Sequence, residues 1–158
     1  MEIHLVRHAH AGSRKAWDGD DRDRPLSDRG WVQAEGIEKA LADVGVDRVW
    51  SSAYVRCIQT LDPLAERLGL EVEVVEPLSE GGSGAEALDL LLYAARSGLT
   101  VAACSHGDVI PAVVATALGR GAQLDGPASA AKGGRYVLSV ADGAVAALRY
   151  VPPADRTD

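Results

Sequence analysis

Short apolar, β-branched runs alternate with longer stretches of helical periodicity along most of this chain, and this alternation constrains the fold more than any other feature. Strands that alternate with helices form a mostly parallel sheet covered by helices on both faces. We therefore predict an α/β protein, a three-layer α/β/α sandwich with a mostly parallel central sheet. The predicted strands are residues 3–6, 46–50, 72–75 and 100–104, and the predicted helices are residues 28–44, 53–68, 85–96 and 108–118.

Local signals mark where the helices begin and end. Ser27 has the residue type of a helix N-cap. Gly45 and Gly69 stand where the helical patterns stop, as C-terminal glycines do. Pro63 lies inside the second helical stretch and is predicted to interrupt it.

Near the C-terminus the alternation of strands and helices gives way to two consecutive predicted strands. Two apolar runs joined by Asp142-Gly143 predict a hairpin of residues 136–140 and 144–151. No internal repeat or linker separates it from the rest, so we predict one domain over residues 1–151 with a frayed tail over 152–158. The predicted loops are residues 9–25, 76–84 and 120–134, the last of them small, polar and flexible.

The charge and hydropathy of the chain exclude some classes of partner. The formal net charge of the 158 residues is −7, and no long block of Lys and Arg is present. A nucleic-acid binder needs a basic face, so we predict no nucleic-acid partner. No apolar run approaches the roughly 20 residues that cross a membrane, so we predict no membrane partner.

The cellular compartment can be predicted from the two cysteines and from the N-terminal residues. Cys57 and Cys104 lie far apart and fit neither a disulfide framework nor a zinc knuckle. The chain start lacks the basic and apolar regions of a signal peptide. We expect a cytoplasmic protein with reduced thiols, and we interpret Cys104 as a core residue rather than a nucleophile.

Polar residues follow each predicted strand of the parallel part. In open α/β sheets, ligands bind at the carboxyl ends of the strands. The topology would thus bring two arginines, two histidines and one carboxylate to one edge. The residues that follow the four strands are Arg7-His8, then Ser51-Ser52 with Arg56, then Glu80, then Ser105-His106-Gly107.

Each of these residue types has a role in phosphoryl transfer. Guanidinium groups bind phosphate oxygens with bidentate geometry. A neutral imidazole can attack phosphorus and become a phosphohistidine, which divides one hard step into two easier ones. A second histidine can stabilise the equatorial oxygens, and a carboxylic acid can protonate the leaving oxygen and then activate water. None of these roles requires a metal ion.

Leu5-Val6-Arg7-His8 resembles the signature of the histidine phosphatase superfamily, whose fold is phosphoglycerate mutase-like. Arg7-His8-Ala9 followed by Ala11 looks like its small SixA-type branch. Further motifs match in the same order: Arg24-Pro25-Leu26-Ser27 with Gly30, Ser51-Ser52 with Arg56 and Thr60, and Ser105-His106-Gly107. Closer still, Ala11-Gly12-Ser13, Gly19-Asp20-Asp21, Arg56-Cys57 and Lys132-Gly133 look like the phosphatase half of actinobacterial Nudix–histidine phosphatase proteins.

The resemblance implies that His8 is the nucleophile, and that Arg7, Arg56 and His106 form the phosphate pocket. It matches Glu80 to the proton donor only loosely, because that loop varies. It also implies substrate contacts in the residues Ser13, Arg14, Gly107 and Lys132.

Arg14 departs from the pattern, since many members carry an asparagine there, and a basic residue suggests a pocket for more than one phosphate group. The 25 residues between Glu80 and His106 are too few for a cap domain, so we expect an open pocket. No Nudix domain precedes Met1, so we expect any such activity on another chain.

Three functions remain open from the sequence. The first is a metal-independent, SixA-like phosphohistidine phosphatase acting on a phosphorylated protein. The second is a phosphatase of the same fold acting on a nucleotide or another small phosphorylated metabolite. The third is a phosphate-binding module without turnover. The oligomeric state is left without a prediction.

We predict no metal ion and no cofactor. His4, His8 and His10 alternate, but four residues of a strand span about 13 Å, too far for His4 and His8 to share one ion. The mixed-charge run Asp18–Arg24 is interpreted as a solvated loop.

Overall fold

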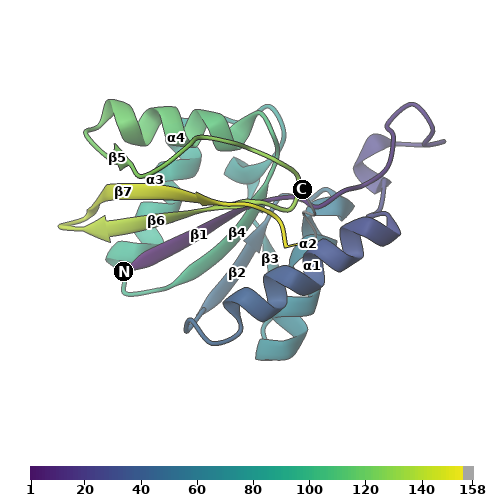
Figure 1. Cartoon of the computed structure of the whole chain (residues 1–158), viewed down its shortest axis with the longest axis horizontal. Helices are drawn as coiled ribbons and strands as arrows, with labels where there is room; N and C mark the ends of the chain where they lie inside the picture. Colours follow the sequence, from purple (N-terminus) through teal and green to yellow (C-terminus); the bar gives the residue numbers. More distant parts are fainter. Residues whose placement is uncertain (155–158) are drawn as a thin grey trace.

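The computed structural model describes residues 1–154. In this part of the chain, one seven-stranded sheet with the order β3-β2-β4-β1-β6-β7-β5 lies between two pairs of helices (Figure 1). The strands are β1 Glu2–Arg7, β2 Arg48–Ser51, β3 Val72–Val74, β4 Val101–Ser105, β5 Gln123–Leu124, β6 Arg135–Ala141 and β7 Ala144–Val151. The helices are α1 Asp28–Leu41, α2 Val55–Leu68, α3 Gly84–Arg96 and α4 Val109–Gly119, with the short 3-10 helices η1 Asp21–Asp23 and η2 Glu76–Leu78.

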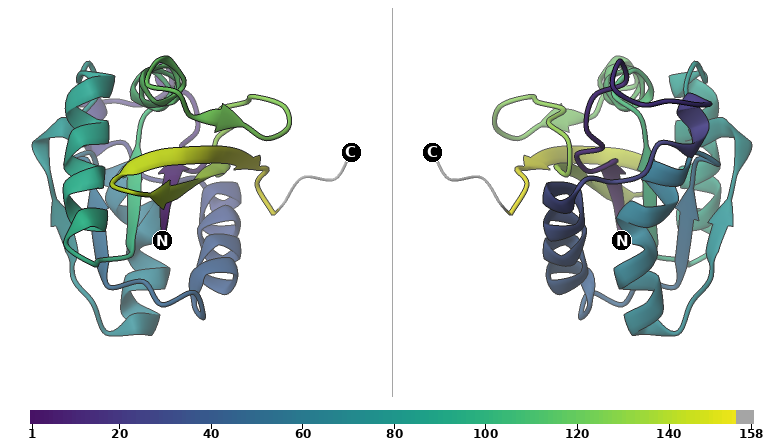
Figure 2. Two further views of the ribbon diagram at one scale, coloured as in Figure 1. Left: turned by 90° about the vertical axis from the view of Figure 1, so that its left-hand side faces the viewer. Right: turned by 90° about the vertical axis from the view of Figure 1, so that its right-hand side faces the viewer.

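The sheet is parallel from β3 to β1 and antiparallel from β1 through β6 to β7, and the edge strand β5 is parallel to β7. Strands β3, β2, β4 and β1 run parallel, whereas β6 is antiparallel to β1 and β7 is antiparallel to β6. Helices α1 and α2 cover one face, and α3 and α4 cover the other (Figure 2). The predicted three-layer sandwich with a mostly parallel sheet is confirmed.

The alternation of side chains along the buried strands builds two cores. Ile3 and Leu5 of β1 pack with α3 and α4, whereas Val6 packs with α1 and α2. In β4, Ala103 faces the first core and Cys104 the second, where it is fully buried. This period of two is what a strand covered on both faces requires.

Several predicted helix and turn signals act as expected. The Ser27 hydroxyl accepts a hydrogen bond from the backbone N–H of Gly30 and caps α1. Gly69 ends α2 in the left-handed region at φ 69°. Asp142 and Gly143 both have positive φ, 53° and 77°, which is the geometry of a two-residue hairpin turn.

Helix α2 runs unbroken through Pro63, so the predicted interruption is wrong. A proline inside a helix removes one backbone hydrogen bond and costs about 3 kcal/mol. Leu61 and Leu64 on either side of it are fully buried against the sheet. Burial of two leucine side chains contributes roughly 3–6 kcal/mol, which offsets that cost.

Residues 120–134 hold more structure than predicted. Strand β5 pairs with β7 in parallel, with Leu124 opposite Leu148. At the end of the segment, the N–H of Gly133 donates to the carbonyl groups of Arg7 and His8. The prediction of a flexible loop is therefore wrong at β5 and at Gly133.

The predicted tail divides in two. Pro153 is buried, and Ala154 packs so closely against Gly36 of α1 that a Cβ on Gly36 would come within 2.7 Å of its methyl group. Pro153 and Ala154 thus lie against the domain, and residues 155–158 lie outside the described part of the chain. None of the helices in residues 1–154 has the length and apolarity that a membrane-spanning helix needs.

Between Glu80 and His106 the chain forms only α3, β4 and their short connections. No cap domain covers the carboxyl ends of the strands in residues 1–154. The predicted absence of a cap agrees with this arrangement.

Candidate active site

The ends of the parallel strands meet at one edge of the sheet, as their backbone hydrogen bonds show. The N–H of His8 donates to the carbonyl of Ser105, and the N–H of Ser52 donates to the carbonyl of Cys104. A cleft of about 440 Å³ opens at this edge. It is lined by Arg7, His8, Gly12, Arg14, Arg24, Arg56, Glu80, His106, Gly107, Asp108 and Lys132.

His8 follows the last residue of β1 and is 5% exposed. Its Nδ1 lies 2.9 Å from the carbonyl oxygen of Ala9. A carbonyl only accepts, so Nδ1 carries the proton, and Nε2 of the neutral ring keeps its lone pair. Burial, with a smaller contribution from Arg56, lowers the pKa of His8 to about 3, although the bond to Ala9 opposes this. The ring is therefore neutral near pH 7.

His106 follows β4, and its ring centroid lies 5.6 Å from that of His8. Its Nε2 lies 2.8 Å from the Ser52 hydroxyl and 3.5 Å from the sulfur of Cys57. The Tyr54 ring packs edge-on against it at 4.6 Å. These contacts fix the His106 ring beside His8.

Arg7 ends β1 and points into the cleft over Gly107. Its Nη1 donates to the carbonyl of Ala130. A Cβ on Gly107 would come within 2.7 Å of the Arg7 guanidinium carbon. Only glycine at position 107 leaves room for this placement of the guanidinium group.

Arg56 lies in the first turn of α2 and is 1% exposed. Its Nη1 donates to the backbone carbonyl of Asp21 at 2.8 Å, and its Nη2 donates to the Asp21 carboxylate at 3.0 Å. The guanidinium carbon lies 4.8 Å above the centre of the Tyr54 ring. The loop before α1 and the start of α2 are thus joined through one buried arginine.

Three buried polar atoms of these residues have no hydrogen-bond partner among residues 1–154. They are Nε of Arg7, Nε of Arg56 and Nδ1 of His106. Buried polar groups in folded proteins are nearly always paired, because an unpaired one costs about 1–3 kcal/mol. All three belong to residues that line the cleft, so a ligand with acceptor oxygens that binds there would offer partners to these residues.

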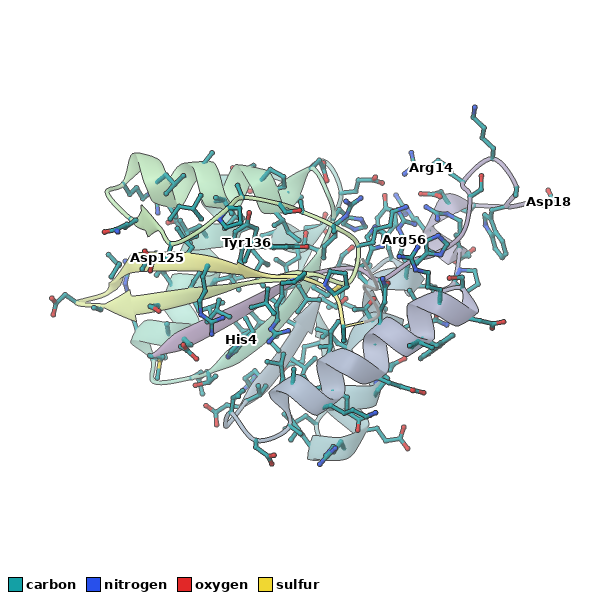
Figure 3. The ribbon with its side chains drawn as sticks, viewed as in Figure 1. His4, Arg14, Asp18, Arg56, Asp125 and Tyr136 are labelled. Atoms are coloured by element: carbon teal, nitrogen blue, oxygen red, sulfur yellow. The ribbon has the colours of Figure 1, made fainter. Side chains whose placement is uncertain are left out.

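Two loops meet at the mouth of the cleft. Nη2 of Arg14 lies 3.2 Å from the Glu80 carboxylate and 3.3 Å from the Asp21 carboxylate. The other oxygen of Glu80 lies 3.8 Å from Nη2 of Arg56. Figure 3 shows Arg14 near Arg56 and Asp18 at the outer end of the same loop.

Lys132 and Gly107, two of the residues predicted to bind substrate, also line the cleft. Burial first, and then the charges of Arg7, Arg24 and other arginines, lower the pKa of Lys132. Ser13 is the exception among the predicted site residues. It is exposed and lines an adjacent hollow with Trp17 and Pro25 rather than the cleft.

The interpretation of Asp18–Arg24 as a solvated loop is wrong at two residues. Arg24 is buried, and its Nη1 donates to the carbonyl of Ala11 at 2.8 Å. Asp21 accepts hydrogen bonds from Arg24 and Arg56, and despite the opposing effect of burial these bonds lower its pKa. The spacing of Asp21 and Arg24, three residues apart, is the signal that could have revealed this pair.

Five cations and two carboxylates line the cleft of a chain whose net charge is −7. This excess of positive charge suits an anionic ligand. In residues 1–154, no three His, Cys, Asp or Glu side chains lie close enough together to hold a metal ion.

Comparison with known proteins identifies the family to which this chain is similar. Residues 3–88 match the model of the histidine phosphatase superfamily (branch 1). The chain is 35% identical over 155 residues to the 8-oxo-(d)GTP phosphatase of Mycolicibacterium smegmatis (strain ATCC 700084 / mc(2)155). That match covers 96% of this chain and 48% of the relative, so the chain spans about half the length of this curated protein.

Solved structures share the whole fold. The protein histidine phosphatase SixA complexed with tungstate superposes with a TM-score of 0.77 at 20% identity, over 96% of this chain and 94% of its own. The putative phosphohistidine phosphatase SixA from Nakamurella multipartitia superposes with a TM-score of 0.73 at 29% identity, over 97% of this chain and 96% of its own.

Proposed function

The chain belongs to the histidine phosphatase superfamily, and from this premise we propose that residues 1–151 form one metal-independent phosphatase domain that works through a phosphohistidine at His8. The observation that carries the proposal is the hydrogen bond from Nδ1 of His8 to Ala9. It leaves a neutral imidazole whose Nε2 lone pair is free to attack phosphorus.

In the first step, Nε2 of His8 forms a bond to phosphorus, and the bond from phosphorus to the leaving group breaks with its electron pair. Arg7, Arg56 and His106 hold the three equatorial oxygens of the phosphoryl group. Each of these residues has one nitrogen without a hydrogen-bond partner among residues 1–154, and we assign these nitrogens as donors to the phosphoryl oxygens. Gly107 and Lys132 complete the same cleft.

In the second step, water attacks phosphorus and the electron pair of the nitrogen–phosphorus bond returns to His8. Inorganic phosphate leaves, and the Glu80 carboxylate takes the proton of the water. Glu80 lines the same cleft as His8, and for this reason we assign the role of base to it.

Two substrate classes fit this site. The likeness to a putative SixA at 29% identity supports a phosphohistidine protein as substrate. The likeness to the mycobacterial 8-oxo-(d)GTP phosphatase supports a nucleotide or another small phosphorylated molecule. The cleft is uncapped, so either class has access to His8.

The first test is release of phosphate at neutral pH with a chelator present. The panel holds an aryl phosphate, a phosphohistidine peptide, and nucleoside mono-, di- and triphosphates. Wild-type protein should hydrolyse at least one of them, and His8→Ala should lower the rate by at least 10³-fold, because the covalent step is lost.

Thermal unfolding of His8→Ala serves as the folding control. Rapid acid quenching of the wild-type reaction should trap the acid-labile phosphoenzyme, and the variant should form none. Tight binding of vanadate without turnover of any panel member would favour the phosphate-binding module. Loss of activity in the chelator would contradict a metal-independent mechanism.

A further inference from the structure

Arg14 connects the two loops that flank the cleft, although it is the most exposed of the ion-paired arginines there. Its side chain is 62% exposed, and its Nη2 lies 3.2 Å from the Glu80 carboxylate and 3.3 Å from the Asp21 carboxylate. The hydrogen bond to Glu80 joins residues 66 positions apart in the chain. Surface ion pairs contribute little stability, so removal of the Arg14 side chain should barely change the free energy of unfolding.

The two carboxylates that line the cleft, Glu80 and Asp108, and the adjacent Asp21 all have hydrogen-bond or ion-pair partners. Glu80 faces Arg14 and Arg56 through its two oxygens. Asp108 accepts the backbone N–H of Gly81 at 2.8 Å. Asp21 is held by Arg24, Arg56 and Arg14 at 2.9, 3.0 and 3.3 Å.

The state of these carboxylates matters for the leaving group. An alcohol departs as a strongly basic alkoxide unless an acid protonates it. A phosphate departs as a stable anion and needs no proton. Of the acidic residues described at this edge, Glu80, Asp21 and Asp108, none stands free of a donor in the structure.

We propose that Arg14 is a specificity-determining residue that selects substrates whose leaving group is itself a phosphate. By holding Glu80 it withholds the proton donor that an alkoxide requires, and by its own charge it binds a departing phosphate. The substrate class is then a phosphoanhydride, with one phosphoryl group on His8 and the neighbouring phosphate at Arg14. This inference rests on the proposed reaction at His8.

The atoms of the step balance without an added proton. Nε2 of His8 bonds to the terminal phosphorus of a nucleoside diphosphate, and the bridging P–O bond breaks. The electron pair stays on the bridging oxygen, so the nucleoside monophosphate leaves as its dianion. The same attack on a nucleoside monophosphate would release an alkoxide, which must acquire one proton.

ADP and AMP form a matched substrate pair, since they share the nucleoside and differ in the leaving group. We expect wild-type kcat/KM for ADP to exceed that for AMP by at least 100-fold in the presence of a chelator. Arg14→Ala should lower kcat/KM for ADP at least tenfold. Because Glu80 is released at the same time, the ratio of kcat/KM for ADP to that for AMP should fall at least tenfold.

Arg22→Ala is the matched control. Arg22 lies in the same loop region, is exposed, and does not line the cleft, so both substrates should keep their wild-type rates. Inorganic pyrophosphate carries the anhydride without a nucleoside and should show the same dependence on Arg14. Circular dichroism checks that both variants are folded.

The reaction at His8 is tested separately by p-nitrophenyl phosphate, whose leaving group needs no proton and carries no phosphate. Its hydrolysis should depend on His8 and keep its wild-type rate in Arg22→Ala, and Arg14→Ala should lower it less than it lowers ADP hydrolysis. The proposal is overturned if AMP is hydrolysed as well as ADP, or if Arg14→Ala slows ADP and AMP equally. If wild-type protein did not hydrolyse p-nitrophenyl phosphate at all, the proposed function itself would be refuted.

Discussion

At the scale of single residues, the position of His8 directly after β1 sets both the tautomer and the protonation of its imidazole ring. The carbonyl of the next residue fixes the tautomer. Burial and the neighbouring positive charges keep the ring unprotonated. The same burial has an energetic consequence, because the unfolded chain has no such environment.

His8 should make the protein less stable in acid. The unfolded side chain has a pKa near 6.5, and the folded one about 3. Between these values the unfolded state binds a proton that the folded state does not. The stability contribution of neutral His8 is therefore complete above about pH 6.5 and is lost as the pH falls toward 3.

The measurement compares urea unfolding of wild-type protein and His8→Asn at pH 7 and pH 5. The wild type should lose about 2 kcal/mol more than the variant between the two values. Other titrating groups cancel in the difference. An equal loss in both proteins would show that His8 is not held neutral by the fold.

At the scale of the elements, the two helices on one face of the sheet approach each other closely at Gly84. A Cβ on this residue, at the start of α3, would come within 2.5 Å of the backbone of Ala112 in α4. The loop that carries Glu80 leads directly into this contact. The short distance between α3 and α4 thus requires a residue without a side chain at position 84.

Gly84→Ala should destabilise the protein by about 1–3 kcal/mol, because the backbone of Ala112 cannot make room for a Cβ by changing rotamer, as a side chain can. The matched control is Gly119→Ala at the end of α4, where a Cβ would meet nothing within 4 Å. That variant should be neutral or stabilised by up to about 1 kcal/mol. The measurement is the free energy of unfolding of both variants, obtained by chemical denaturation. Equal values would contradict the close packing of α3 on α4.

At the scale of the whole molecule, the site is assembled from loops that project beyond a well-packed sheet. Residues 12–20 form a continuous exposed run at one end of the molecule (Figure 1). Their neighbours Asp21 and Arg24 are tied to the cleft. Opening of this loop should therefore be local and coupled to ligand binding.

Limited trypsin digestion should make its first cut within residues 1–154 after Arg14 or Lys15, in the exposed run. Saturating vanadate, as a phosphate mimic, should slow this cut several-fold, because Arg14 and Arg24 line the cleft. Arg14→Ala should reduce that protection. A first cut after Arg120, or no effect of vanadate, would contradict the coupling of the loop to the cleft.

The sequence by itself determined the elements and the edge at which the site forms. Apolar period, caps such as Ser27 and the Asp142-Gly143 turn act over a few residues, so their effects can be inferred locally. His8, Arg56 and His106 each follow a strand, and parallel strands end at one edge of the sheet. The cleft containing these three residues was predictable for that reason.

The tertiary structure alone decided how the loops return across this edge. Asp21 meets Arg56 across 35 positions and Arg14 meets Glu80 across 66, and Ser13 turns to a different hollow. Strand β5 forms only because β7 offers it a free edge. Such contacts depend on the path of the backbone between distant segments, and no local periodicity encodes that path.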